Sequence, residues 1–153
     1  MRKLLYLLIL PLCFLLGCKS TDQGAIDKQI IQQYISAHHL NATAEANGLY
    51  YVPIVTGTGT HPTATSLVSV TYKGYLTDGT VFDQNTTPTP FNLGGVIPGW
   101  TQGIPLMQRG GKATLLIPSA LGYGSQAIPA SGGNAGIPAN SVLIFDVDLI
   151  SFQ

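Results

Sequence analysis

Hydrophobic and polar residues alternate along several short stretches of the chain. The alternation runs from Val68 to Tyr72 and again through residues 141–152, where two aspartates separate apolar side chains. A period of two places successive side chains on opposite faces of a strand, so both stretches are predicted to be strands with one buried face. Further strands are expected over residues 49–55, 81–83 and 112–118.

A helical period appears nearer the start of the chain. Isoleucine and tyrosine side chains recur three and four residues apart between Ile26 and Ile35, which predicts an amphipathic helix over residues 27–38. Asp22 or Asp27 is placed to favour the start of this helix through the helix dipole. A second helix, short at most, is expected over residues 101–108, because a proline interrupts that segment.

Segments rich in Gly, Pro and Thr separate these elements and are predicted to be loops. They cover residues 56–65, 86–90 and 125–140. Asp78 and Gly79 form a typical tight turn between two of the strands, which favours antiparallel neighbours. The predicted fold class is therefore α+β, with a bent antiparallel sheet of about five strands and one short helix.

The start of the chain has the features of an export signal. A short positive region precedes an apolar run from Leu4 to Leu16, which is shorter than the roughly 20 residues that span a bilayer. The run is therefore interpreted as a secretory signal peptide. It ends in Leu15-Leu16-Gly17-Cys18, which resembles the bacterial lipobox, in which the cysteine is lipidated. We expect a lipid on Cys18 and removal of the residues before it.

These features divide the chain into three parts. We expect a lipoprotein signal peptide over residues 1–17, a lipid-anchored polar tether with one helix over residues 18–47, and a folded domain over residues 48–153. Lys19 follows the lipidated cysteine, and by resemblance to the lipoprotein sorting pattern this favours the outer membrane. The expected location is the bacterial cell envelope, facing the periplasm. Cys13 leaves with the signal peptide, so no disulfide is expected.

Composition excludes several classes of function. The chain has no formal net charge, only 9% of its residues are charged, and no Lys/Arg cluster could follow a phosphate backbone, so nucleic-acid binding is not expected. No metal or other cofactor is expected either, since the neighbouring His38 and His39 would point in different directions on a helix. The chain lacks a Gly-x-Ser-x-Gly nucleophile motif, and His61 has no evident serine or acid partner.

The strongest candidate for a functional site is Val96-Ile97-Pro98-Gly99-Trp100, which contains the only tryptophan. A tryptophan usually buries its large ring while its N–H seeks a partner. Gly99 lets another group approach the backbone closely. The residues alone leave two interpretations open, an aromatic floor of a concave site or a side chain that fills the core.

Four motifs follow one another in the folded domain. They span Val70–Asp83, Val96–Trp100, Leu121–Gly124 and Ile137–Val147. In this order and combination they resemble the FKBP-type peptidyl-prolyl cis-trans isomerases, and the resemblance extends from about Gly48 to Phe152. With the lipobox, the chain resembles a bacterial lipoprotein member of that family.

The resemblance implies a half-barrel sheet wrapped around the short helix, with a proline pocket between them. It implies catalysis of rotation about Xaa-Pro bonds in exported proteins, which assists their folding. Substrates would be proline-containing polypeptides, and macrolides would be inhibitors. The implied catalytic residues are Tyr72, Phe82, Asp83, Trp100 and Tyr123, with Trp100 as the pocket floor. The implied substrate-binding residues are Phe91, Val96, Ile97, Ile137 and Phe145. Peptide would bind through the Tyr123 hydroxyl and the backbone N–H of Ile97.

Two other functions are compatible with these residues. One is a non-catalytic chaperone module that binds proline peptides, and the other is an anchored structural protein. The chain also departs from the family pattern in three places. The loop over residues 123–137 is longer than in small members, Gly136 stands where an apolar residue is common, and no arginine lies between Asp83 and Phe91. These departures concern contacts between loop and substrate, and the affinity for macrolides.

Overall fold

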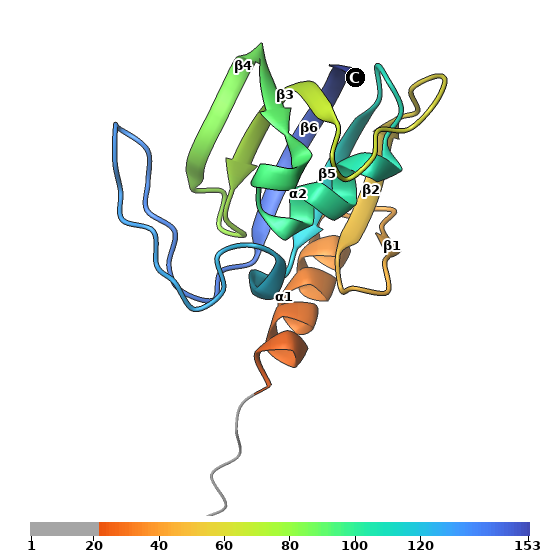
Figure 1. Cartoon of the computed structure of the whole chain (residues 1–153). Helices are drawn as coiled ribbons and strands as arrows, with labels where there is room; N and C mark the ends of the chain where they lie inside the picture. Colours follow the sequence, from red (N-terminus) through yellow and green to blue (C-terminus); the bar gives the residue numbers. More distant parts are fainter. Residues whose placement is uncertain (1–21) are drawn as a thin grey trace, which may run out of the picture.

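The structure, a computed structural model, describes residues 22–153 and is built on one six-stranded sheet (Figure 1). The strands are β1 (Thr43–Ala44), β2 (Tyr50–Val55), β3 (Leu67–Tyr75), β4 (Val81–Asn92), β5 (Lys112–Ile117) and β6 (Leu143–Phe152). Their order across the sheet is β1-β2-β5-β6-β3-β4, and every neighbouring pair is antiparallel. The predicted α+β fold is confirmed. The additional strand, β1, is too short to produce a recognisable pattern.

One face of the sheet packs on the short helix α2 (Pro98–Gly103), which continues into the 3-10 turn η2 (Ile104–Leu106) (Figure 1). Pro98 occupies the start of the helix, where a missing N–H costs no hydrogen bond, so the helix begins earlier than predicted. The helix lies very close to β5, since a Cβ added at Gly99 would stand 2.5 Å from the Ile117 side chain. This layer forms the larger hydrophobic core of the protein.

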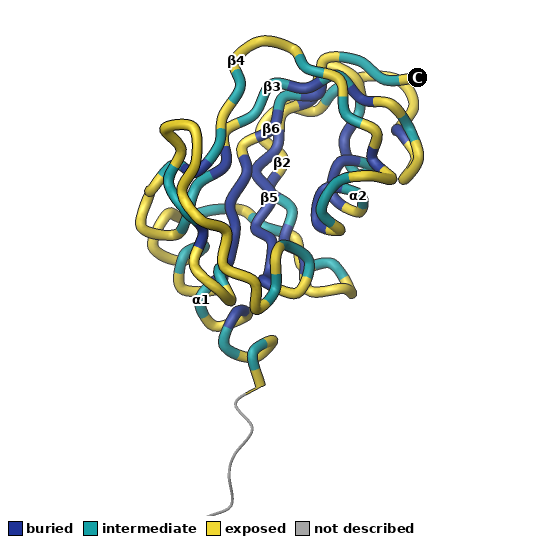
Figure 2. The backbone as a smooth tube through the Cα atoms, turned by 60° about the vertical axis from the view of Figure 1, so that its left-hand side comes forward, coloured by how far each residue is buried: buried dark blue, intermediate teal, exposed yellow. Residues whose placement is uncertain are grey.

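The opposite face of the sheet is covered in part by α1 (Gln23–Ala37), which confirms the predicted N-terminal helix (Figures 1 and 2). Leu115 and Leu116 of β5 are both fully buried, but Leu115 belongs to the α2 side and Leu116 to the α1 side. Ile31 is the fully buried residue that α1 adds to this second core. Asp22 caps the helix by accepting the N–H of Gly24 at 3.1 Å. The helix is therefore packed on the domain as well as leading into it.

The prediction of a loop over residues 86–90 is wrong, because these residues lie within β4. β4 is one of the two edge strands of the sheet, so one of its sides has no neighbour. Its register against β3 shifts between Val70 and Tyr72, where β4 has extra residues, as in a bulge. A proline cannot donate to a sheet ladder but is tolerated at an edge or a bulge, which explains how Pro88 and Pro90 fit here.

Residues 125–140 form the predicted long loop, but its middle folds back on itself. Ile128 and Ile137 exchange two backbone hydrogen bonds of 2.8 Å, and we call residues 128–137 the loop hairpin. A Cβ added at Gly136 would stand 2.8 Å from the backbone oxygen of Ile128. The departure from the family pattern at Gly136 thus has a steric reason, since the two arms of the hairpin leave no room for a side chain.

The predicted signal peptide, residues 1–17, and the predicted lipidation of Cys18 lie outside the described residues. In the described part, residues 22–153, no helix has the length and hydrophobicity needed to cross a membrane.

Candidate active site

Four aromatic rings from different elements meet beside α2. Trp100 lies among them, with its ring centroid 5.1 Å from Tyr72 of β3, 5.4 Å from Phe91 of β4 and 5.3 Å from Phe145 of β6. All three contacts are nearly perpendicular, which is an arrangement that aromatic pairs prefer. Trp100 is only 4% exposed, so the other three rings pack on a side chain that is held in the core.

These rings border a cavity of about 110 Å³, which we call the aromatic cavity. It is lined by Tyr72, Asp83, Phe91, Val96, Ile97, Trp100, Tyr123 and Phe145. All eight are predicted site residues. The remaining two, Phe82 and Ile137, line a neighbouring cavity of about 230 Å³, which shares Asp83, Tyr123 and Phe145 with the first. Trp100 therefore fills the core and also borders the cavity, so both interpretations of the sequence apply.

Phe82 supports the aromatic cavity from behind. It is 5% exposed, and its ring centroid lies 5.4 Å from that of Phe145 at a nearly perpendicular angle. A Cβ added at Gly74 would stand 2.6 Å from the Phe82 ring and 2.7 Å from the Phe145 ring. The glycine of the first motif thus makes room for this pair of rings, and Phe82 is as much a core residue as a site residue.

Tyr72 and Asp83 form the polar side of the aromatic cavity. The Tyr72 hydroxyl donates a hydrogen bond of 2.8 Å to Asp83 Oδ2, which links β3 to β4 at the cavity. Burial raises the pKa of Tyr72 well above its ordinary value, and the hydrogen bond to Asp83 raises it further. The hydroxyl therefore stays protonated at neutral pH and keeps its bond to Asp83. This bond fixes the orientation of both side chains.

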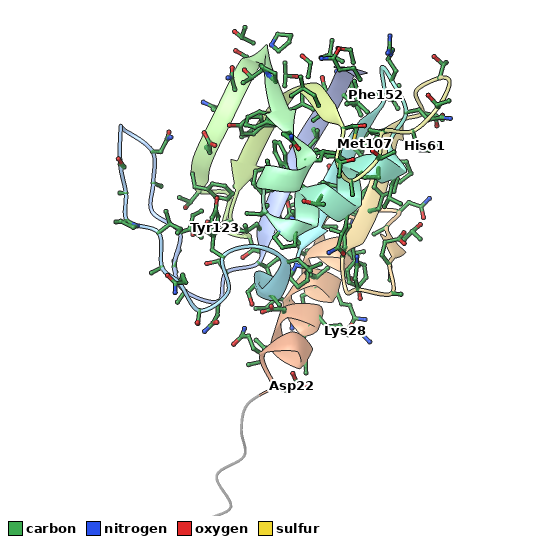
Figure 3. All side chains as sticks on the ribbon, in the orientation of Figure 1. Asp22, Lys28, His61, Met107, Tyr123 and Phe152 are labelled. Atoms are coloured by element: carbon green, nitrogen blue, oxygen red, sulfur yellow. The ribbon has the colours of Figure 1, made fainter. Side chains whose placement is uncertain are left out.

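Tyr123 lies at the mouth of the cavity, on the turn that follows the 3-10 helix η3 (Ser119–Leu121) (Figure 3). It is 38% exposed, so its hydroxyl is accessible to a ligand. Burial of the rest of the side chain raises its pKa, and the negative charge of Asp83 adds to the shift. Tyr123 is therefore a neutral hydrogen-bond donor at physiological pH.

A second donor lies across the cavity from the sheet. Ile97 precedes α2, and its carbonyl accepts the N–H groups of Trp100 and Thr101 at 2.9 and 3.2 Å. The hydrogen bonds found among residues 22–153 include none from the Ile97 N–H, so this half-buried donor is available to a ligand. The Nε1 of Trp100 also has no partner in the same part of the chain, but it is buried and out of reach of a ligand. The base of the cavity consequently offers aromatic surface and no accessible donor.

The sequence did not identify the loop hairpin as part of the site. Ile128, Pro129, Ser131, Asn134 and Ala135 line the second cavity beside the predicted residues. A signal for it is present, because two Ile-Pro pairs flank a Gly-Gly dipeptide, a combination that favours a tight turn between two extended arms. Both of these glycines have positive φ angles, as such a turn requires.

The residues of the site are suited to binding and orienting a ligand. The lining contains no serine, cysteine or histidine beside the aromatic rings of the first cavity. No group of three or more His, Cys, Asp or Glu residues within residues 22–153 is arranged to hold a metal ion. The geometry suits an apolar ring in the cavity and a peptide carbonyl at its mouth, facing the donors of Tyr123 and Ile97.

Comparison with known proteins gives a consistent result. Residues 58–150 match the FKBP-type peptidyl-prolyl cis-trans isomerase family. The FKBP-type peptidyl-prolyl cis-trans isomerase FkpA of Aeromonas hydrophila is 40% identical over 138 residues, covering 86% of this chain and 49% of that protein. FK506-binding protein 4 of Dictyostelium discoideum is 44% identical over 108 residues, covering 69% of this chain and 28% of that protein.

The fold is also shared with solved structures. The crystal structure of FkpA from Escherichia coli superposes with a TM-score of 0.73 and 36% identity, covering 86% of this chain and 60% of that one. A peptidyl-prolyl cis-trans isomerase from Pseudomonas syringae superposes with a TM-score of 0.70 and 31% identity, covering 84% of this chain and 95% of that one. The chain spans about half the length of the FkpA relatives that it matches. The match over residues 58–150 includes the whole aromatic cavity, and the chain belongs to the family of FKBP-type peptidyl-prolyl cis-trans isomerases.

Proposed function

We propose that this chain catalyses cis/trans isomerisation of Xaa-Pro peptide bonds in exported proteins and so assists their folding. The observation that carries the proposal is the aromatic cavity itself. Rings from three strands and one helix line a small, mainly apolar space, and two residues that carry free hydrogen-bond donors, Tyr123 and Ile97, line it as well. Proline is an apolar ring joined to a peptide carbonyl, so these are the groups that its recognition needs.

The proposed mechanism requires no covalent step. Rotation about a peptide bond is slow because amide resonance gives a barrier of about 18–20 kcal/mol. Water stabilises the planar, more dipolar amide by hydrogen bonding to its oxygen, and an enzyme lowers the barrier by favouring the twisted form. In our proposal the aromatic cavity keeps water from the proline ring and from the peptide bond that rotates, while Trp100 and Phe145 support the ring.

The polar residues have separate roles in this proposal. Tyr123 and the Ile97 N–H hold the peptide carbonyls, so that only the intended bond rotates. Asp83 acts on the cavity wall, because its carboxylate accepts the Tyr72 hydroxyl at 2.8 Å and fixes that ring against Trp100. Neither tyrosine needs to transfer a proton, which agrees with the raised pKa of each hydroxyl.

The alternative is a non-catalytic module that binds proline peptides as a chaperone. The same cavity supports binding in both cases, so the distinction is kinetic. We favour catalysis because Tyr72, Phe82, Asp83, Trp100 and Tyr123 are all present, whereas a domain freed from selection for turnover would be expected to lose some of them. Since one relative is named FK506-binding protein 4, we propose that the cavity also accepts macrolide inhibitors.

A lipid on Cys18 would place this activity at the cell envelope, and the residue after it, Lys19, supports the outer membrane. The helix α1 begins a few residues later, at Gln23, so a lipid-bound chain would carry its folded domain close to the membrane surface. The expected clients are exported chains that fold in that compartment.

The test is exchange between the cis and trans forms of a short Xaa-Pro peptide, followed by NMR with and without the full chain. Catalysis predicts faster exchange, and Tyr123→Phe should lower kcat/KM by about 2- to 10-fold, since one net hydrogen bond contributes about 0.5–1.5 kcal/mol. Tyr75→Phe is the matched control, because that hydroxyl lies near Asp146, outside the aromatic cavity. Peptide binding without faster exchange would support the chaperone alternative, and complete loss in folded Tyr123→Phe would indicate proton transfer.

A further inference from the structure

A buried carboxylate joins α1 to the turn that carries Tyr123. Asp27 is 1% exposed, and its Oδ2 accepts two hydrogen bonds from Ser119, 2.8 Å from the backbone N–H and 2.6 Å from the hydroxyl. Its Oδ1 accepts a third, from Gln23 Nε2 at 2.7 Å. All three donors are neutral. Asp27 lies outside the region that matches the family, so the family motifs do not account for it.

Ser119 in turn holds the residues on both sides of Tyr123. Its carbonyl accepts the N–H of Gly122 at 2.9 Å and that of Gly124 at 2.8 Å. Ser119 itself is 2% exposed, so its bonds with the Asp27 carboxylate are shielded from water. An unbroken series of hydrogen bonds therefore leads from the Asp27 carboxylate, through Ser119, to the backbone that flanks Tyr123.

Stacking on other aromatic rings does not place Tyr123. The ring contacts found among residues 22–153 join Trp100 to three other rings of the aromatic cavity, but none involves Tyr123. The position of its hydroxyl consequently depends in part on the backbone of the turn. The bonds to Ser119 therefore help to hold the donor at the mouth of the cavity.

Asp27 is not needed merely to attach α1. Ile31 already docks the helix on the second core, and an apolar residue in place of Asp27 would avoid the cost of burying a charge. A buried carboxylate is tolerated when it is fully hydrogen-bonded, and it then imposes strict geometry on its donors. Here the donors that it constrains are the two groups of Ser119.

We propose that Asp27 is a positioning residue for the isomerisation, acting through Ser119 on Tyr123. The inference rests on the proposed role of Tyr123 in binding the peptide carbonyl. Replacing Asp27 by asparagine keeps its size but leaves one acceptor oxygen for three donors, which weakens the hold on Ser119. The turn then loosens, and kcat/KM falls by no more than the loss caused by Tyr123→Phe, about 2- to 10-fold.

The test is a double-mutant cycle on the full chain, with Asp27→Asn in the wild-type and Tyr123→Phe backgrounds. We expect Asp27→Asn to lower kcat/KM in the first background and to have almost no effect in the second. Ile31→Val is the matched control, because it weakens the docking of α1 without touching Ser119. It should lower stability and leave kcat/KM unchanged at temperatures where every variant is folded.

Two results would overturn the proposal. One is an effect of Asp27→Asn that is equally large in both backgrounds, which would mean that it acts on the fold as a whole. The other is an unchanged kcat/KM in folded Asp27→Asn while Tyr123→Phe is impaired. Failure of the proposed function is distinguishable, because the wild-type chain itself would then not speed up cis/trans exchange. In that case the NMR signals of the Tyr123 ring test the connection from Asp27 to Tyr123. We expect them to shift in Asp27→Asn and not in Ile31→Val. Unshifted signals in Asp27→Asn would refute the connection.

Discussion

Ile31→Ala should destabilise the protein as strongly as a substitution in the main core. Ile31 is fully buried in the second core, where α1 meets the sheet. The substitution removes three buried carbon groups at about 0.8 kcal/mol each, and the cavity left behind raises the cost. Alanine favours a helix slightly more than isoleucine, which offsets about 0.5 kcal/mol. The expected loss is about 2–4 kcal/mol of unfolding free energy.

Urea denaturation of the full chain, followed by circular dichroism, measures this loss. Ile54→Ala is the matched control, since it removes the same carbon groups from a β2 side chain that is 60% exposed, and should cost less than about 1 kcal/mol. If both variants lose the same small amount, then α1 is not docked in solution. The folded domain would then begin near residue 48, as the sequence suggests, and the helix would be a tether only.

Three further results are expected. Cys18→Ser should release the protein from membranes or block its processing, and cell fractionation with mass spectrometry of the intact protein would contradict the lipid anchor if the variant matched the wild type. The raised pKa values of Tyr72 and Tyr123 predict that the unfolding free energy is steady up to about pH 10 and falls above it, because these tyrosines lose their protons first in the unfolded chain. Thermal melts across this pH range measure the effect, and a rise in stability above about pH 10 would refute the reasoning. Chemical denaturation should show that Phe82→Ala lowers the unfolding free energy by about 3–5 kcal/mol. Gly74→Ala should lower it by about 1–3 kcal/mol, because the new Cβ would stand 2.6 Å from the Phe82 ring. A stable Gly74→Ala protein would show that the two rings have room to move.

The alternating strands were predictable because their environment is simple. β3 and β6 each have neighbours on both sides and one face toward the larger core, so a period of two is visible in their sequences. β4 is different, because it lies at the edge and carries a bulge. Its Thr and Pro residues are typical of a loop, and nothing local in residues 86–90 reveals that β3 lies beside them.

The site was predictable to the extent that its residues belong to motifs. Eight of ten predicted residues line one cavity, although they come from segments up to 73 positions apart, Tyr72 to Phe145. That convergence came from the resemblance and not from periodicity. Phe82 and Ile137 were placed in the same group, but they border the neighbouring cavity, because the loop hairpin folds over that side.

The role of Asp27 could not be predicted from local sequence. On an amphipathic helix an aspartate is expected to face solvent or the helix start, and Asp22 alone takes the capping role. Ser119, which donates two hydrogen bonds to Asp27, lies 92 residues away, at the start of η3. A long-range hydrogen bond of this kind produces no repeating pattern in the sequence. The helical repeat of apolar residues from Ile26 to Ile35 predicted the helix, but it did not predict which surface the helix covers.

The edges of the sheet bear on how the proposed clients would bind. One edge, β4, carries Pro88 and Pro90 beside a bulge, and the other, β1, is two residues long. Exposed edges normally recruit extended chains by backbone pairing, and both of these offer only short or interrupted ladders. If the chain acts on unfolded clients as we propose, a client would therefore bind through its proline side chain and not by backbone pairing along the edge of the sheet.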